Sequence, residues 1–376
     1  MFGGIKLQLM IGPGVPVPAP QTVLDALQEV KITVTAGSTF SGFQLTFALG
    51  KSSPLHTLFA VSGNAPIPLV RVLIVASVNG VMEVLMDGVM TQHQSTPGGN
   101  GADGTLIISG TDISQVMNYI DFSGLPYPAI PIEGRIALMI AKYAMFGLIP
   151  LVVPTVLTDI EIPISKIPRQ KGKDLEYIKL LAEQVGYVFY VTPGPAPGAN
   201  VAYFGPEVRI GVPQPALNID MDAHTNVESI NFTLDTEKAV TPVLNIQIPE
   251  AKVTIPIPLP NVSLLSPPLG AVQPLSKNVE PIQNIANQSP IRAALFGLAK
   301  AVKSNDVVQG KGTLNVLRYG RVLKARQLVG VRGAGVAFDG LYFVKAVTHT
   351  IKRGDYKQEF TLVRNGLIST LPVVPG

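Results

Sequence analysis

The stretch DGLYFVKAVTHTIKRGDYKQEFTLVRNG, Asp339–Gly366, decides the fold. It contains two runs, Leu341–Thr350 and Tyr356–Arg364, in which apolar and polar side chains alternate. A period of two predicts β-strands with one packed face and one face turned to solvent or a lumen. In the second run the predicted inner face holds Tyr356, Phe360 and Leu362, and the outer face holds Lys357, Glu359 and Thr361. The stretch is therefore expected to form a hairpin.

Strand patterns extend upstream of this hairpin. Gly312–Leu317 and Val322–Val331 are predicted strands, and Ile230, Phe232 and Leu234 alternate with polar residues. Near the start, Val30, Ile32 and Val34 alternate with Lys31, Thr33 and Thr35, and Phe43–Leu49 is a second alternating run. Asn79-Gly80 separates two apolar runs and predicts a tight type I′ turn.

Between the β-rich parts lies a helical pattern. Asp174–Val185 places apolar residues on one face, with Asp174 expected to cap the first turn and Gly186 to end the helix. Asp112–Tyr119 is expected to make one or two helical turns. Ile136–Val153 is apolar, but Arg135 and Lys142 flank or interrupt it, and Gly147 and Pro150 break it. A buried helix followed by a strand is favoured there over a membrane span.

A proline-rich segment, Thr241–Pro290, interrupts the second β-rich part. Proline lacks a backbone donor, so this segment is expected to be an extended arm or edge and not a central strand. Ser289–Ser304 has helical spacing. We expect the arm to dock on a neighbouring chain, because it carries few charges.

The predicted fold class is β-rich (α+β). Residues 1–123 form a first β unit, residues 124–225 an α+β insert with a helix at 174–185, and residues 226–240 with 308–370 a second β unit. Residues 241–307 are the arm and helix inserted in that unit. The residues alone leave open whether the two β units are a duplication.

Composition narrows the classes of partner. Charged residues make up 14% of the chain, against roughly 25% in ordinary domains. Such a chain is expected to bury surface against copies of itself or other proteins. The net charge of +4 is spread out, which gives specific nucleic-acid binding little support. The start of the chain lacks the pattern of a signal peptide. With no cysteine, disulfides and zinc–thiolate sites are excluded.

Few residues suggest chemistry. The histidines are His56, His93, His224 and His349. His349 is interpreted as a packing residue, and Asp220, Asp222 and His224 as a solvated loop instead of a metal site. Gly330, Gly333 and Gly335 lack the context of a phosphate loop and predict a turn. The triplets at Asn231, Asn261 and Asn287 fit a glycosylation pattern but carry no functional prediction. No catalytic, cofactor or metal residue is predicted.

The hairpin resembles the closing hairpin of the phage late control gene D family, which includes contractile-tail hub proteins and the hub part of type VI secretion spike proteins. Two blocks agree in order: VLMDGVM with LIISGTDISQVM (84–90 and 106–117), and DLEYIKLLAEQVGYVFYV (174–191). The hairpin and upstream positions that match the family pattern are Gly340, Tyr342, Val344, Val347, His349, Gly354, Tyr356, Phe360, Leu362, Arg364, Gly312, Leu317, Arg318, Gly320 and Arg321. The proline-rich arm is longer than the family pattern.

The resemblance implies two tube-protein-like antiparallel β-barrels per chain, so that a homotrimer forms a pseudo-six-fold ring. It implies a structural baseplate hub, not an enzyme, that joins a six-fold tail tube to a three-fold spike. Because the chain ends soon after the hairpin, the spike is expected on a separate protein. Expected partners are a tube or tube-initiator protein, that spike and baseplate wedge proteins, with no cofactor and no stable membrane insertion. Assembly is expected in the bacterial cytoplasm, within a virion or injection particle.

Two alternatives remain at this stage. One is a cell-wall hydrolase associated with the baseplate, because carboxylate pairs for glycoside hydrolysis leave no fixed sequence motif. The other is a secreted protein that acts on membranes through 136–153 or the arm.

Overall fold

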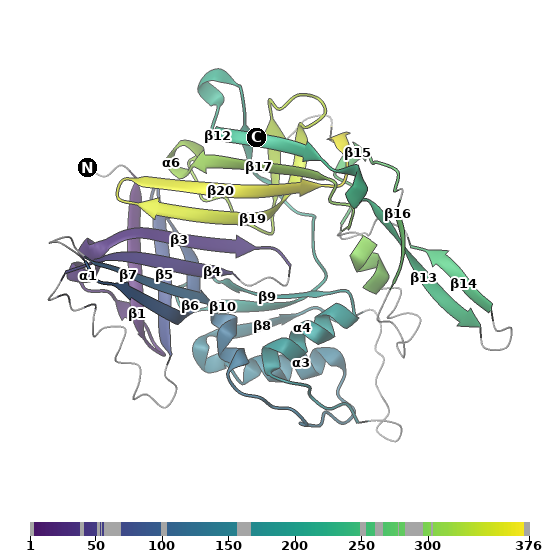
Figure 1. Ribbon diagram of the computed structural model, residues 1–376, viewed down its shortest axis with the longest axis horizontal. Helices are drawn as coiled ribbons and strands as arrows, with labels where there is room; N and C mark the ends of the chain where they lie inside the picture. The colour runs from purple at the N-terminus through teal and green to yellow at the C-terminus, as the bar shows by residue number, and fades with distance from the viewer. Residues whose placement is uncertain are drawn as a thin grey trace.

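A computed structural model describes residues 4–37, 41–50, 53, 55, 69–98, 104–155, 167–248, 253–259, 266–276, 278–282, 296–301 and 304–371. The protein is built mainly of antiparallel β-sheet, with few helices (Figure 1). The β-rich fold class expected from the sequence is confirmed. Among the described strands the hydrogen-bonded path is open and forms no closed barrel.

The main sheet takes its first half from the N-terminal part of the chain. Helix α1 (Gln21–Ala26) precedes β3. The strands of this half are β1 (Ile5–Pro13), β2 (Val17–Pro18), β3 (Leu27–Thr35), β4 (Gly42–Leu49), β5 (Val70–Val78), β6 (Val81–Thr96) and β7 (Gly104–Asp112). Asn79 and Gly80 join β5 to β6 with φ angles of 51° and 85°. These values fit the predicted type I′ turn, in which both central residues need positive φ.

The second half of the sheet comes from residues beyond 213. Its strands are β11 (Gln214–Asn218), β12 (Val227–Leu234), β17 (Val308–Asn315), β18 (Leu328–Arg332), β19 (Gly340–Lys352) and β20 (Asp355–Arg364). The short helices η4 (Asp222–His224), η5 (Thr236–Lys238) and α6 (Val316–Tyr319) lie between them. β19 and β20 form the predicted hairpin. β11 falls within the expected insert, 124–225, yet it pairs with β18 of the main sheet.

The two halves repeat one strand order. The first half runs β3-β4-β7-β6-β5 and the second runs β12-β17-β20-β19-β18. In chain order the first half is β3, β4, β5, β6, β7 and the second is β12, β17, β18, β19, β20. In each half the first two strands along the chain are neighbours in the sheet, and the last three lie in reverse order beside them. The halves join where β3 pairs antiparallel with β19. The structure thus shows a repeated sheet unit that the residues alone left open.

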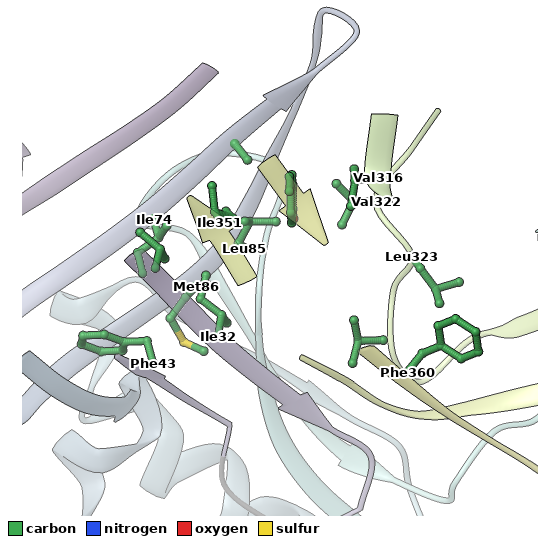
Figure 2. Packing of buried hydrophobic residues seen from close by; sticks show 14 of the residues in the cluster. Ile32, Phe43, Ile74, Leu85, Met86, Val316, Val322, Leu323, Ile351 and Phe360 are labelled. Atoms are coloured by element: carbon green, nitrogen blue, oxygen red, sulfur yellow. The ribbon is translucent and has the colours of Figure 1, made fainter. Parts of the chain in front are cut away.

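One apolar core underlies both halves. Figure 2 shows members from the first half, including Ile32 and Met86, and from the second half, including Leu323 and Phe360. Ile351 of β19 belongs to the same cluster. Because the side chains of each strand alternate, only one face of the sheet feeds this core.

A second core holds the α+β part below the sheet in Figure 1. It packs η2 (Ile113–Asn118), α3 (Ile132–Ala141), η3 (Ala144–Phe146) and α4 (Asp174–Gln184) against β8 (Leu148–Val152), β9 (Val188–Pro193) and β10 (Asn200–Gly205). These strands form a separate sheet in the order β8-β10-β9. The predicted buried helix followed by a strand within 136–153 is confirmed, as are the helical turns after Asp112.

Helix α4 ends as predicted from the sequence, but its first turn differs from the prediction. Gly186 takes φ 71°, and Tyr187 N–H donates to Ala182 O, which closes the helix as predicted. Asp174 is the first helical residue and caps nothing, since the capping position is Lys173 without a side-chain bond. The prediction of an Asp174 cap is wrong because its carboxylate is fully buried and bonded elsewhere.

The arm forms a three-stranded sheet that projects from the body at the right of Figure 1. Its strands are β14 (Val253–Pro258), β13 (Val240–Ile248) and β16 (Asn278–Pro281), in that order. Pro242 lies in β13, the central strand, so the prediction that proline keeps this segment out of central strands is wrong. Pro242 still serves as an acceptor, because its carbonyl receives the N–H of Leu259. β15 (Gly270–Val272) pairs with β21 (Leu367–Ser369).

Two strand predictions near the hairpin need correction. Leu317 lies in α6 because Asn315 ends β17 and caps that helix, accepting from Leu317 N–H at 3.0 Å. The predicted strand Val322–Val331 begins only at Leu328. The side-chain amide of Gln358 bonds both the N–H and the carbonyl of Leu323, at 2.9 and 2.8 Å, in place of a partner strand. Of the predicted helix 289–304, the described residues are 296–301 and 304, and all of them are helical.

Candidate functional site

The outer face of the main sheet is a continuous polar surface, which we call the polar face. It spans β6, β7, β4, β3, β19, β20, β17 and β12. In β20, Tyr356, Phe360 and Leu362 are buried, whereas Glu359 is exposed and its neighbours on that face are partly exposed. The two-sided hairpin predicted from the sequence is therefore confirmed, and every strand of the run contributes to its polar side.

The register lines up polar residues in rows across the strands. Serine, threonine, asparagine and glutamine dominate these rows. One row is Gln92, Ser109, Gln44, Lys31, Thr350, Lys357 and Asn315. The next is Thr111, Gly42, Thr33, Thr348, Glu359, Thr313 and Ser229. Both rows cross the junction between the two halves.

Charges on the polar face nearly balance. Lys352 lies 3.7 Å from Glu29 across the β3–β19 junction, and the Lys357 ammonium lies 3.0 Å from a Glu228 oxygen. The charged residues of its second half and junction are five lysines (Lys31, Lys311, Lys345, Lys352, Lys357) and four carboxylates (Glu29, Glu228, Asp355, Glu359). A nearly neutral, hydroxyl-rich surface holds neither a polyanion nor a polycation firmly, because such binding depends on neutralising charge.

His349 lies beneath this face and is a packing residue. It is 4% exposed, and its Nδ1 lies 2.8 Å from the hydroxyl oxygen of Tyr356. Burial lowers the pKa of His349 to about 4, so the imidazole is neutral at neutral pH. Burial also raises the pKa of Tyr356. The prediction that His349 packs and bonds is confirmed.

Arg364 stabilises the end of the hairpin through hydrogen bonds to backbone carbonyls. Its fully buried guanidinium donates to three carbonyls, of Gly366, Asp339 and Ala337, at 2.7 to 2.8 Å. It also lies over the ring of Tyr342, 4.5 Å from the centroid. A buried guanidinium needs this many acceptors to offset lost hydration. Arg364, a matching position in the sequence, therefore serves to hold the turn that precedes β19.

A buried ion pair joins the first half of the sheet to the α+β part. Arg71 of β5 donates to both oxygens of Asp87 of β6, at 2.8 and 2.6 Å. Arg71 also reaches the carbonyls of Phe146 and Gly198, and Asn200 donates to Asp87 at 2.6 Å. The sequence predictions missed this pair. The available signal was the one basic residue of β5, Arg71, next to a strand with two acidic residues, Glu83 and Asp87, in otherwise apolar runs.

Asp174 organises a second buried network. Its carboxylate accepts from Lys142, Tyr143 and Gln170, at 2.9, 2.8 and 2.7 Å. Burial and the neighbouring carboxylate raise the pKa of Tyr143. Each partner of Asp174 belongs to the α+β part, so the network fixes α4 against α3 and has no group directed to a substrate.

The other candidates from the sequence do not converge. His93 lies exposed on β6, and His224, Asp220 and Asp222 are exposed around η4. His56, Asn261 and Asn287 lie outside the described residues, and Asn231 is exposed on β12. Within the described ranges, no three histidine or acidic side chains are grouped to hold a metal. Gly333 and Gly335, with φ of 83° and 89°, lie in the predicted turn between β18 and β19, but Gly330 lies within β18, where it pairs with Leu341, so its place in the turn was wrongly predicted.

A hollow of about 570 Å³ lies between the β5–β6 turn and residues 319–324. Three charged residues line it: Glu83 and Lys324, which pair with each other at 2.8 Å, and Arg321. Asn79 donates to the carbonyl of Gly320 nearby, at 3.1 Å. The polar groups of the hollow therefore link the two halves of the sheet.

No helix among the described residues is long and apolar enough to cross a membrane. No protein-family model and no curated protein matches the sequence. Solved structures do match, and the fold that they define is that of phage and prophage tail proteins.

Three of these structures cover most of the chain. A tail protein from Neisseria meningitidis MC58 has a TM-score of 0.61 and 13% identity, covering 97% of this chain and 98% of its own. The 43 kDa tail protein of prophage MuSo2 from Shewanella oneidensis has a TM-score of 0.62 and 13% identity, covering 96% and 98%. The E. coli c3393 protein, a type VI secretion component, has a TM-score of 0.52 and 11% identity, covering 93% and 76%. The expected likeness to tail hub proteins is confirmed at the level of the fold.

Proposed function

We propose that this protein is a structural baseplate hub of a contractile injection machine. In this role it joins a six-fold tail tube to a three-fold spike. The tail-protein fold supports the proposal. The buried charged groups Arg71, Asp174 and Arg364 also support a structural role, because their partners are other parts of the fold.

The observation that carries the proposal is the repeated sheet unit. One chain presents the strand order β3-β4-β7-β6-β5 and then β12-β17-β20-β19-β18. A closed three-fold ring of such chains would present six similar units. That geometry suits a partner with six-fold symmetry on one side and a partner with three-fold symmetry on the other. A homotrimer is therefore the proposed assembly, with each half of the sheet forming one of six similar parts of the ring.

The polar face is proposed to line the central channel. Its charges nearly balance, with pairs at Lys352–Glu29 and Lys357–Glu228, and hydroxyl and amide groups make up most of the remaining surface. A cargo that moves through a channel must not be held by the wall. A neutral wall meets this need for both nucleic acid and protein, because neither finds a matching field.

The arm is proposed to dock on a neighbouring chain of the ring. Its described residues carry one charge, Glu280, which pairs at 3.3 Å with Lys300 of the helical segment that follows. Leu275 and Val279 of the arm are 90% and 65% exposed. Its own core is small and centres on Leu244 and Ile282. A neutral projection with exposed apolar side chains favours a protein partner over a phosphate surface.

Imaging tests the proposal directly. Purified protein should form rings of three with a central channel, seen by electron microscopy, and should co-sediment with its tube and spike proteins. Deleting 241–282 should weaken the ring, and the matched control is alanine substitution of exposed Arg318 and Arg321. Protein that stays monomeric alone and with tube and spike present would contradict the hub function. Clearing of a peptidoglycan zymogram by the pure chain would contradict the structural assignment and favour a hydrolase.

A further inference from the structure

Strand β6 is paired on one side along only part of its length. Val81–Val89 pair with β5, and Gly88–Thr96 pair with β7 on the other side. Within the described residues, Met90–Thr96 have no strand on the side that β5 occupies earlier. From Thr91 to Thr96 every residue is exposed. This stretch of β6 therefore offers a free row of backbone donors and acceptors.

The equivalent strand of the other half shows what such a stretch binds. β19 pairs at its start with β18, from Gly340 to Phe343. Its second part, Ala346–Lys352, pairs with β3 on that same side. β19 and β6 hold the same place in the repeated order. The free part of β6 is thus the counterpart of the part of β19 that binds β3.

The counterpart of β3 is β12, which has one edge without a partner strand in the described part of the chain. β12 pairs with β17 from Val227 to Leu234, and its other edge has no strand among the described residues. The strand is held firmly, because Phe232 stacks on Phe338 with ring centroids 5.0 Å apart. The run from β6 to β12 alternates in direction through antiparallel pairs. β12 of one copy and β6 of another would therefore continue the antiparallel order.

These two edges lack the protection found on other edges of the protein. Pro150 lies in β8, Pro215 in β11, and Pro256 and Pro258 in β14. Proline at an edge removes a donor and blocks pairing with another chain. The free part of β6 and the whole of β12 contain no proline. Each edge has a bulge near one end, at Met90/Gln92 and at Val227/Ser229, but the rest of it is a regular strand without proline. Such edges are templates for strand pairing, so a partner strand is expected on both.

We propose that Met90–Thr96 of β6 pairs antiparallel with β12 of a second copy of this chain, repeating the β3–β19 junction between chains. This inference rests on the hub proposal and supplies its chain-to-chain contact. Each copy has one β6 edge and one β12 edge, so the β6 edge of one copy meets the β12 edge of the next. This head-to-tail contact closes into a ring when the rotation between copies is three-fold. The polar face then runs without a break around the channel.

Engineered disulfides test the contact. The chain has no cysteine, so each introduced pair reports alone. All six positions are on the polar side of their strands. Each variant carries one cysteine at Gln92, Gln94 or Thr96 and one at Ser229, Asn231 or Thr233. Under oxidation at least one pair should give covalent dimers and closed trimers on a non-reducing gel, and reduction should return monomers.

Matched controls separate this contact from chance collision. Single-cysteine variants and a pair that joins Gln94 to Thr254 on the β14 edge should stay monomeric on the gel. A second variant, Gln94→Pro, should remove the ring while circular dichroism stays that of folded protein. Thr254→Pro is its control, because Thr254 has the same register parity as Pro256 and should leave the ring intact.

The outcomes distinguish the contact from the hub function. Three-fold rings by microscopy with no cross-link from any pair, and with Gln94→Pro still forming rings, would overturn the β6–β12 contact and leave the hub proposal standing. Cross-linking into open polymers with no ring would support the edge pairing and count against the trimeric hub. A folded monomer without cross-links under every condition would overturn both.

Discussion

The hydroxyl oxygens of Thr33 and Thr348 lie 3.1 Å apart and share a hydrogen bond, although 315 positions separate the two residues in the sequence. The bond lies at the junction of β3 and β19, where the two halves of the main sheet become one surface. It is also the template for the contact proposed between chains. The junction is therefore the first place to perturb.

Thr348→Val should lower the free energy of unfolding by about 1 kcal/mol, because it removes one side of a partly buried hydrogen bond. The double variant Thr33→Val with Thr348→Val should cost no more than the single one, since no hydroxyl is left without its partner. Urea denaturation measures both. Thr350→Val on the same face is the control and should stay within about 0.5 kcal/mol. Fully additive losses would show that the two hydroxyls do not interact.

Asp87→Ala should destabilise the protein strongly, by about 3–5 kcal/mol, because it leaves the buried Arg71 guanidinium without its counter-ion. Replacing both partners, Arg71→Met with Asp87→Leu, should recover most of that loss. The control is Glu280→Ala, which breaks the exposed pair with Lys300 and should cost less than about 1 kcal/mol. Equal losses for Asp87→Ala and Glu280→Ala would rule out a buried joint at this position.

His349 should make stability depend on acid. Its pKa is lowered to about 4 in the folded protein from the ordinary 6.5. As pH falls from 6.5 towards 4, His349 becomes protonated in the unfolded chain but stays neutral in the folded protein. The contribution of His349 to the free energy of unfolding is therefore fully present above pH 6.5 and is lost between pH 6.5 and 4. The loss approaches about 3 kcal/mol at the lower end. His349→Gln should remove this part of the pH dependence in denaturant titrations. If the free energy of unfolding changed between pH 7 and pH 4 by the same amount in His349→Gln as in the unsubstituted protein, a buried neutral imidazole would be contradicted.

Gly333→Ala should destabilise far more than Gly335→Ala, although both glycines have positive φ in one turn. A methyl group on Gly333 would overlap the carbonyl oxygen of Ile219, whereas one on Gly335 meets open space. We expect about 1 kcal/mol for Gly335→Ala, from backbone strain alone. Gly333→Ala should reach about 3 kcal/mol, the upper end of ordinary single substitutions. Thermal unfolding compares the two, and equal shifts would show that the turn adapts to the methyl group.

Local patterns in the sequence predicted local structure well. The alternation in Tyr356–Arg364 predicted both faces of β20, and Asn79-Gly80 predicted its turn. The predicted strand over Val322–Val331 was wrong because the Gln358 amide takes the place of a partner strand at Leu323. The predicted cap at Asp174 was wrong for a similar reason, since a buried carboxylate bonded to Lys142 and Tyr143 cannot also turn to the helix end. In both cases a distant side chain outweighed a local preference.

The sequence by itself determined where strands and turns form and which side of each strand faces the core, because burial of alternate side chains depends only on neighbours along the chain. Only the tertiary structure decided that β3 pairs with β19, that Arg71 bonds to Asp87, and that part of β6 and one edge of β12 have no partner among the strands described. Backbone donors and acceptors are alike at nearly every residue, so the pattern of side chains does not specify which distant strand they bond. The polar face and its proposed contact between chains follow from that choice of partners.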